Sequence, residues 1–99
     1  MDITEVRIKL MEDQQERLQA FCSITFDHCF VVRNMKVIAS DKGLILCMPS
    51  RKMPDGSFKD VAHPITVEFR SLLESKVFAC YEREVLQAAA GNKVDSRVV

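Results

Sequence analysis

The chain has 99 residues, a hydrophobic fraction of 47%, and 14 basic residues balanced by 14 acidic ones. This length suits a single domain, because a chain of this size buries roughly two-thirds of its unfolded surface. The formal net charge of zero argues against a protein that binds polyanions through its overall charge, so any affinity for nucleic acid has to come from a local cluster of cations.

The sequence carries no sign of export or of membrane insertion. Its apolar runs are far shorter than the ~20 residues that span a bilayer, and its N-terminus does not read as a secretory signal. We therefore expect a cytoplasmic protein with reduced thiols. The spacings of its cysteines are not those of zinc ligands, so we expect no metal and no cofactor, and we interpret these residues as small buried side chains: Cys22, Cys29, Cys47 and Cys80.

The first forty residues show the period-2 alternation of half-buried strands. Charged residues alternate with Val6, Ile8 and Leu10 in a first strand. The polar run at residues 12–16 is typical of a loop, and a second strand follows with one apolar face, formed by Leu18, Ala20, Cys22, Ile24 and Phe26. Phe21 interrupts the polar face of that strand, which indicates that this face is not wholly solvated. A third strand over residues 30–39 changes phase near Asn34, which predicts a β-bulge.

The middle of the chain predicts a basic hairpin. Residues 44–48 form an apolar run that we expect to be a central fourth strand, and residues 58–62 form a short fifth strand. Between these strands, residues 54–56 (Pro-Asp-Gly) have the chemistry of a tight turn. Three cations flank the turn and suit a polyanion better than a small neutral substrate, namely Arg51, Lys52 and Lys59. Arg33 and Lys36 on the third strand would extend this nucleic-acid-binding patch.

The last third of the chain predicts one long helix. Thr66 is placed to cap a helix over residues 67–89, with Gly91 as a stop signal. The helix carries two apolar stripes, and a contiguous apolar patch on a small protein usually marks an interface. We therefore predict a homodimer interface on the second stripe, at Phe78, Tyr81 and Val85. The alternative is a wide core stripe wrapped by a curved sheet.

The segment MPSRKMPDGSFKDVAHPI, residues 48–65, resembles the signature of the SpoVG family (stage V sporulation protein G). Residues 3–8, 23–28 and 30–38 resemble the first three strands of that family, and the likeness extends to about Arg83. Cys22, Cys29 and Met53 depart from the family pattern. The resemblance implies a dimer that binds DNA and RNA and influences septation and gene expression.

These observations predict an α+β fold: an antiparallel sheet of about five strands with a long C-terminal helix. We expect one domain over residues 1–91, a flexible tail over residues 92–99, and a homodimer formed through sheet edges, the helix or both, with helix exchange as an alternative. The favoured function is a DNA- or RNA-binding regulator linked to septation. A protein–protein adaptor in cell division is the first alternative, and a small enzyme using His28 and Cys29 is the second. The side chains of neighbouring strand residues point to opposite faces, so those of His28 and Cys29 should not meet. We therefore expect no catalytic residues, and we expect no small-molecule substrate.

Overall fold

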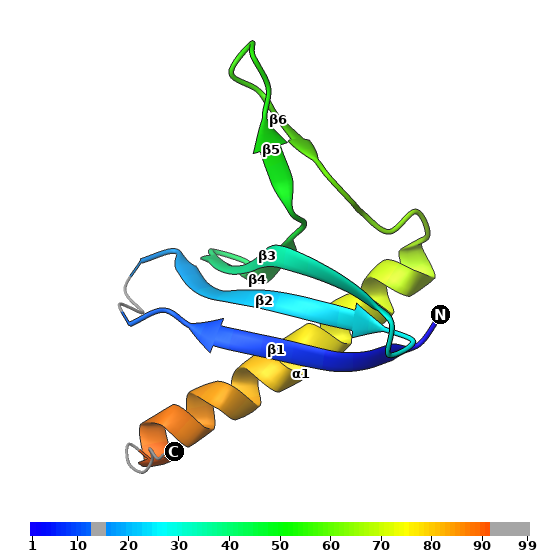
Figure 1. The fold of residues 1–99 in the computed structure, drawn as a ribbon. Coiled ribbons are helices and arrows are strands. Elements are labelled where there is room, and N and C mark those ends of the chain that lie inside the picture. Colours follow the sequence, from blue (N-terminus) through cyan, green and yellow to red (C-terminus); the bar gives the residue numbers. More distant parts are fainter. Residues whose placement is uncertain (13–15, 92–99) are drawn as a thin grey trace.

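The computed structural model describes residues 1–12 and 16–91 of the chain. The predicted tail over residues 92–99 and most of the predicted loop at residues 12–16 lie outside the described residues. The described part contains a four-stranded antiparallel sheet, a separate two-stranded sheet and one helix that lies across one face of the larger sheet (Figure 1). The predicted α+β class is therefore confirmed.

The larger sheet is a simple meander in which each strand pairs with its neighbour in the sequence. It is formed by β1 (Ile3–Leu10), β2 (Leu18–Phe26), β3 (Phe30–Ser40) and β4 (Gly43–Cys47), in that order. The smaller sheet is formed by β5 (Ser50–Lys52) and β6 (Phe58–Asp60). The predicted single sheet of about five strands is thus wrong. Pro49 stands where the chain leaves the larger sheet, and a proline has no N–H to continue a strand ladder.

The position of β4 also differs from the prediction, because β4 is an edge strand and not a central one. The apolar residues of β4 lie on both faces of the sheet. Leu46 is buried under the helix, whereas Ile45 is 45% exposed on the opposite face, where it pairs with Ile38 of β3. An apolar run can therefore reflect two half-buried faces as well as a strand buried on both sides.

The predicted bulge in β3 is confirmed. Along β2 the pairing passes from Cys22 to Ile24 in two steps, while along β3 it passes from Met35 to Val32 in three. Asn34 takes up the extra residue with a φ of 65°, a left-handed conformation that asparagine tolerates better than most residues. The bulge changes the phase of β3, so that Met35 and Val37 face the core beyond it.

The core lies between one face of the larger sheet and helix α1 (Val67–Gly91). Its buried apolar side chains come from the strands, from the segment after β4 and from the helix: Ala20, Cys22, Ile24, Phe26, Met35, Val37, Leu46, Met48, Leu73, Val77 and Tyr81. Among the described residues, Phe26 and Phe69 form the ring contact that joins the sheet to the start of the helix, with centroids 6.0 Å apart.

The start of the helix follows the predicted capping chemistry. The Thr66 hydroxyl accepts a hydrogen bond from the Phe69 N–H at 3.1 Å, and the Thr66 carbonyl accepts one from the Arg70 N–H at 3.1 Å. Glu68 lies in the first turn, where its negative charge opposes the positive end of the helix dipole. No helix in the described part of the chain is both long and apolar enough to cross a membrane.

Candidate nucleic-acid interface

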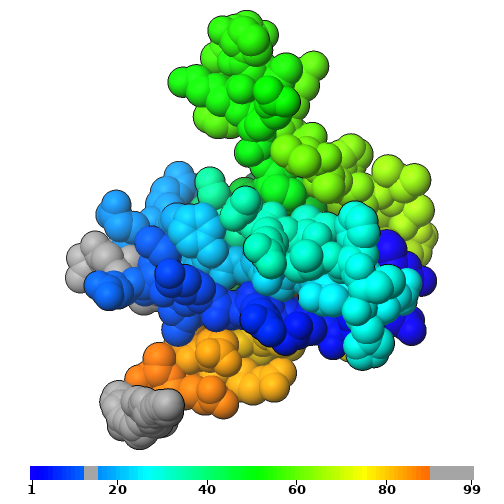
Figure 2. Space-filling view, viewed as in Figure 1, coloured from blue at the N-terminus to red at the C-terminus, as the bar shows by residue number. Residues whose placement is uncertain are grey.

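The predicted basic hairpin stands away from the body of the molecule. In Figure 2 the segment that contains β5 and β6 forms a knob joined to the rest by a narrower neck. A backbone hydrogen bond at 2.7 Å from the Val61 N–H to the Pro49 carbonyl closes the base of this hairpin. Every residue of β5 and β6 is exposed, so the hairpin presents all of its side chains to solvent or to a partner.

The tip of the hairpin is built as its sequence predicts. The Met53 carbonyl accepts a hydrogen bond from the Gly56 N–H at 2.9 Å, which places Pro54 and Asp55 at the two central positions of a turn. Gly56 has a φ of 90°, a conformation that strains residues with a side chain. The hydroxyl and the N–H of Ser57 both donate to the Asp55 carboxylate, and these bonds lower the pKa of Asp55.

The register of the hairpin divides the three predicted cations between two faces. Arg51 lies directly opposite Lys59, while Lys52 lies opposite Phe58. Residues opposite each other in an antiparallel pair share a face, and successive residues of a strand alternate between faces. Arg51 and Lys59 therefore form one cationic pair, and Lys52 points to the other side beside an aromatic ring.

The pair of Arg51 and Lys59 has no counter-charge among the residues that the structure describes. Within the described residues no acidic side chain forms an ion pair with Arg51, Lys52 or Lys59, although Asp60 is on the same hairpin. Like charges placed directly opposite each other in a sheet are unfavourable unless an anion lies between them. The geometry therefore suits a phosphate group, because a guanidinium can bind one through two N–H groups and an ammonium can bind one as a point charge.

The two predicted cations of β3 lie elsewhere, on the face of the larger sheet that α1 does not cover. Lys36 is the register partner of Phe21, and Arg33 lines a shallow hollow with residues of β1 and β2. The structure thus places Arg33 and Lys36 on a different sheet from the hairpin cations. The predicted five-residue patch becomes two separate basic surfaces.

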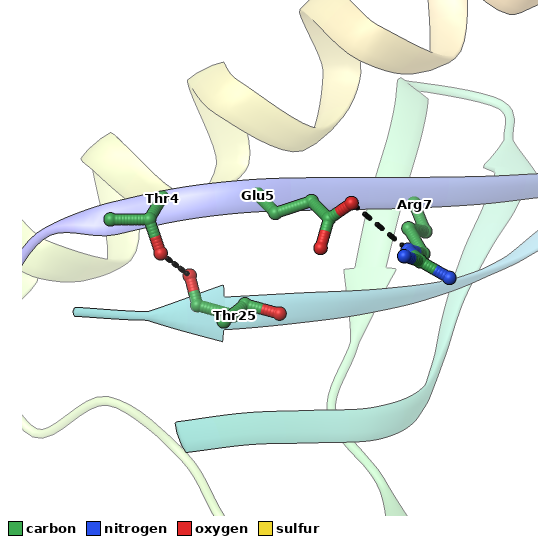
Figure 3. Close-up of polar contacts among 4 residues, drawn as sticks. All are labelled: Thr4, Glu5, Arg7 and Thr25. Carbon is green, nitrogen blue, oxygen red and sulfur yellow. Dashed lines mark hydrogen bonds and ion pairs between the residues drawn. The ribbon is translucent and has the colours of Figure 1, made fainter. Parts of the chain in front are cut away.

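Sequence reasoning assigned no role to Arg7, Lys9 and Phe21, which the structure brings to the same open face as Arg33 and Lys36. Glu5 forms an ion pair with Arg7, with the Arg7 Nε 3.0 Å from the Glu5 Oε2 (Figure 3). Both side chains are well exposed, so this pair contributes little to stability, and a phosphate can displace the carboxylate. The signal in the sequence was Phe21 on an otherwise polar face.

The three residues predicted for the dimer interface pack inside the single chain. Tyr81 is 8% exposed, and Phe78 and Val85 are partly buried against the core. The Tyr81 hydroxyl donates a hydrogen bond to the Gln19 Oε1 at 3.2 Å, and burial raises the pKa of Tyr81. Within one chain the second helix stripe is therefore at least partly covered by the core, and its role in a dimer stays a prediction.

The larger exposed apolar surface lies around the start of the helix and the β2–β3 turn. Phe30 is 64% exposed, Ile65 89% and Val67 79%. Phe30 and Ile65 lie at the mouth of an apolar cavity of about 520 Å³, whose inner walls include Phe26 and Phe69. We call Phe30, Ile65 and Val67 the apolar rim. A pattern search along the helix could not find this surface, because its members come from two distant segments.

The two histidines of the chain lie in connections between elements. Asp27 and His28 are the central residues of the turn in the three-residue connection between β2 and β3, where the Cys29 N–H donates to the Phe26 carbonyl at 3.0 Å. Their φ values of 51° and 58° are those that a type I′ turn requires. The His28 N–H donates to the Thr4 hydroxyl at 2.9 Å, and that hydroxyl donates to the Thr25 carbonyl (Figure 3). His63 lies at the junction before the helix, where its Nδ1 is 3.1 Å from the Pro64 carbonyl oxygen.

The four cysteines are free thiols in different surroundings. Cys22 is buried, and desolvation raises its pKa to about 11, so its reactive thiolate form is scarce at neutral pH. Cys29 is exposed in the β2–β3 turn, which differs from the predicted burial of all four. In the described part of the chain, no group of three or more His, Cys, Asp or Glu side chains could hold a metal ion.

Comparison with known proteins adds to this geometry. The family model SpoVG matches residues 1–83, which include both sheets and most of the helix. The chain belongs to the SpoVG family. "Putative septation protein SpoVG" of Myxococcus xanthus is 45% identical over 91 residues, covering 92% of this chain and 90% of that protein. Two further relatives carry the same name. The protein of Bdellovibrio bacteriovorus is 47% identical over 85 residues, covering 86% of this chain and 77% of that protein. The protein of Caldicellulosiruptor saccharolyticus is 46% identical over 82 residues, covering 83% of this chain and 92% of that protein.

The extent of the SpoVG match agrees with the likeness seen in the sequence, which ended at about Arg83. The hairpin cations, the β3 cations and Phe21 all lie inside the matched region. The final turns of α1, beyond residue 83, lie outside it. Both basic surfaces of this SpoVG protein are therefore built on the part of the chain that defines the family.

Proposed function

We propose that this SpoVG protein is a cytoplasmic, dimeric regulator that binds nucleic acid and acts in septation and gene expression. The observation that carries the proposal is the exposed cross-strand pair of Arg51 and Lys59, which has no acidic partner in the described part of the chain. The names of the SpoVG relatives support the link to septation.

A binding role fits the chain better than a catalytic one. The hairpin carries three cations and two acids, so it supplies a local positive surface on a protein of zero net charge. His28 and His63 both lie in backbone-supporting positions, and His28 sits in the same strained turn as its neighbour Asp27. Phosphate contacts require only fixed cations, which two short paired strands provide.

A second copy of the chain is the partner we propose for the apolar rim. A two-stranded hairpin on its own is marginally stable in water, and Phe58 on β6 is 67% exposed. Burying one large apolar side chain contributes about 1.5–3 kcal/mol, so covering the apolar rim and Phe58 would support association. In a symmetric dimer the hairpin cations would occur twice, which strengthens binding to a polyanion.

The substitution Ile65→Asp should separate such a dimer into monomers. It would place two unpaired carboxylates in an apolar contact and raise the dimer dissociation constant roughly a hundredfold or more. Analytical ultracentrifugation over a range of protein concentrations measures this change. Leu86→Asp is the matched control, because Leu86 is 70% exposed on the far part of the helix. If Leu86→Asp gave monomers and Ile65→Asp did not, the interface would lie on the helix instead.

Fluorescence anisotropy with labelled duplex DNA and with labelled RNA, at about 50 mM and 200 mM salt, tests the function directly. If a dimer neutralises two phosphates, one per chain, through Arg51 and Lys59, duplex affinity should fall roughly 12-fold between these concentrations. Binding that is absent at low salt, or insensitive to salt, would contradict the proposal. That result would favour the alternative, an adaptor that binds a division protein through its apolar rim.

A further inference from the structure

The face of the larger sheet that α1 leaves uncovered has an unusual composition. Its central feature is Phe21 on β2, which is 36% exposed although most large side chains of this strand are buried. Lys9 of β1 and Lys36 of β3 are its register partners on either side. Directly opposed residues of an antiparallel sheet share a face and lie close together. Phe21 therefore lies between two cations in one row across three strands.

A second pair of cations borders the same ring. Arg7 and Arg33 line a shallow hollow of about 250 Å³, together with Lys9, Phe21 and Ser23. The bulge at Asn34 brings Arg33 and Lys36 to one face, although residues three apart in a regular strand point to opposite faces. Phe21 is thus surrounded by four cations from two neighbouring strands.

The charge of this face is strongly one-sided. Strands β1 to β4 contain four cations and one acidic residue, Glu5, which already pairs with Arg7. Two copies of such a face would repel each other, so a second copy of this chain does not suit it. A flexible polyanion with flat apolar groups suits it well, because the cations can hold its charges while Phe21 contacts a flat ring.

We propose that this open face binds single-stranded nucleic acid, with a base stacked on Phe21 and phosphates held by Lys9, Lys36, Arg7 and Arg33. The proposal rests on the proposed function for its ligand class but uses a surface separate from the hairpin. It predicts that the two surfaces differ in the forms of nucleic acid that they accept. The hairpin contacts backbone phosphates, which duplexes and single strands share, while Phe21 needs an unstacked base, which a duplex does not offer.

The test compares anisotropy titrations of a labelled single-stranded oligo(dT) of about 12 nucleotides, a length that one such platform covers, with those of a labelled duplex. Phe21→Leu keeps an apolar side chain but removes the aromatic ring, and Phe21→Tyr keeps the ring. We expect Phe21→Leu to weaken oligo(dT) binding roughly 5- to 150-fold and Phe21→Tyr to change it less than about threefold. Duplex affinity should stay unchanged in both variants.

Equal oligo(dT) affinity in Phe21→Leu and the wild type would overturn the proposal, as would an equal loss for the duplex. If Phe21→Leu does not fold, Lys9→Gln combined with Lys36→Gln tests the same surface. This double variant leaves the Phe21 ring in place and should weaken oligo(dT) binding. Salt-dependent duplex binding without any effect at Phe21 would leave the proposed function standing and remove only this inference. Absence of all binding by the wild type would remove both.

Discussion

The double substitution Arg51→Ala with Lys59→Ala is expected to weaken duplex DNA binding on the order of a hundredfold at low salt. The two side chains face each other across the β5–β6 ladder, and together they hold one phosphate per chain. Their removal should also reduce the slope of log affinity against log salt by about 0.9 per chain. Anisotropy titrations at several salt concentrations measure both effects.

The matched control is Arg83→Ala with Lys76→Ala, which removes the same two side-chain types from exposed positions on the helix. It should leave the affinity and the salt slope close to those of the wild type. The free energy of unfolding should change by less than about 0.5 kcal/mol in either variant, because all four residues are exposed. Equal losses of binding in both variants would mean that general charge, and not the hairpin, attracts the nucleic acid.

Because the hairpin has two faces, its two lysines should contribute differently to binding. Lys52 stands next to Arg51 in the sequence but points to the opposite side, beside Phe58. Lys59→Ala should therefore weaken binding more than Lys52→Ala, although both remove one lysine from the same hairpin. A larger effect of Lys52→Ala would place the phosphate on the face that carries Phe58.

The substitution Leu73→Ala is expected to lower the free energy of unfolding by about 2–5 kcal/mol. Leu73 is 3% exposed and lies in the core between the helix and the sheet, so truncation leaves a cavity that the surrounding strands fill only in part. Denaturant unfolding followed by circular dichroism measures the change. For a domain that is only marginally stable, this loss is a large fraction of the total.

Leu72→Ala provides the control within the same helical turn. Leu72 is 44% exposed, so its truncation should cost less than about 1 kcal/mol. Similar costs at the two positions would mean that the helix does not pack on the sheet through the face that contains Leu73.

Local chemistry predicted the parts of the fold that depend on a few neighbouring residues. The Thr66 cap, the turn at residues 54–56 and the bulge at Asn34 all appear where the sequence placed them. Each rests on the conformational preference or hydrogen-bonding capacity of one or two side chains. The order of the strands in the sheet was harder to predict. As β4 shows, an apolar run can belong to a central strand or to an edge strand with two half-buried faces.

The candidate site was predicted only in part for a related reason. The three hairpin cations flank one recognisable turn in the sequence, so they were found, but their division into two faces depends on Arg51 lying in a strand. The open face requires β1, β2 and β3 in the correct register before Lys9, Phe21 and Lys36 meet. Such registers arise from long-range packing, which a linear pattern does not contain.

The bulge in β3 determines where this strand can change in length during evolution. Loops usually accept the gain or loss of a residue, because nothing beyond them depends on the count. Asn34 lies inside a strand, and side chains there alternate with each residue. The bulge already holds one residue more than β2 requires, so a chain that lost position 34 would join Arg33 to Met35 in regular alternation. Lys36 would stay on the open face, and Met35 and Val37 would still face the helix. Loss of a regularly paired residue would instead turn every side chain beyond it to the other face, so position 34 is where β3 can most readily lose a residue.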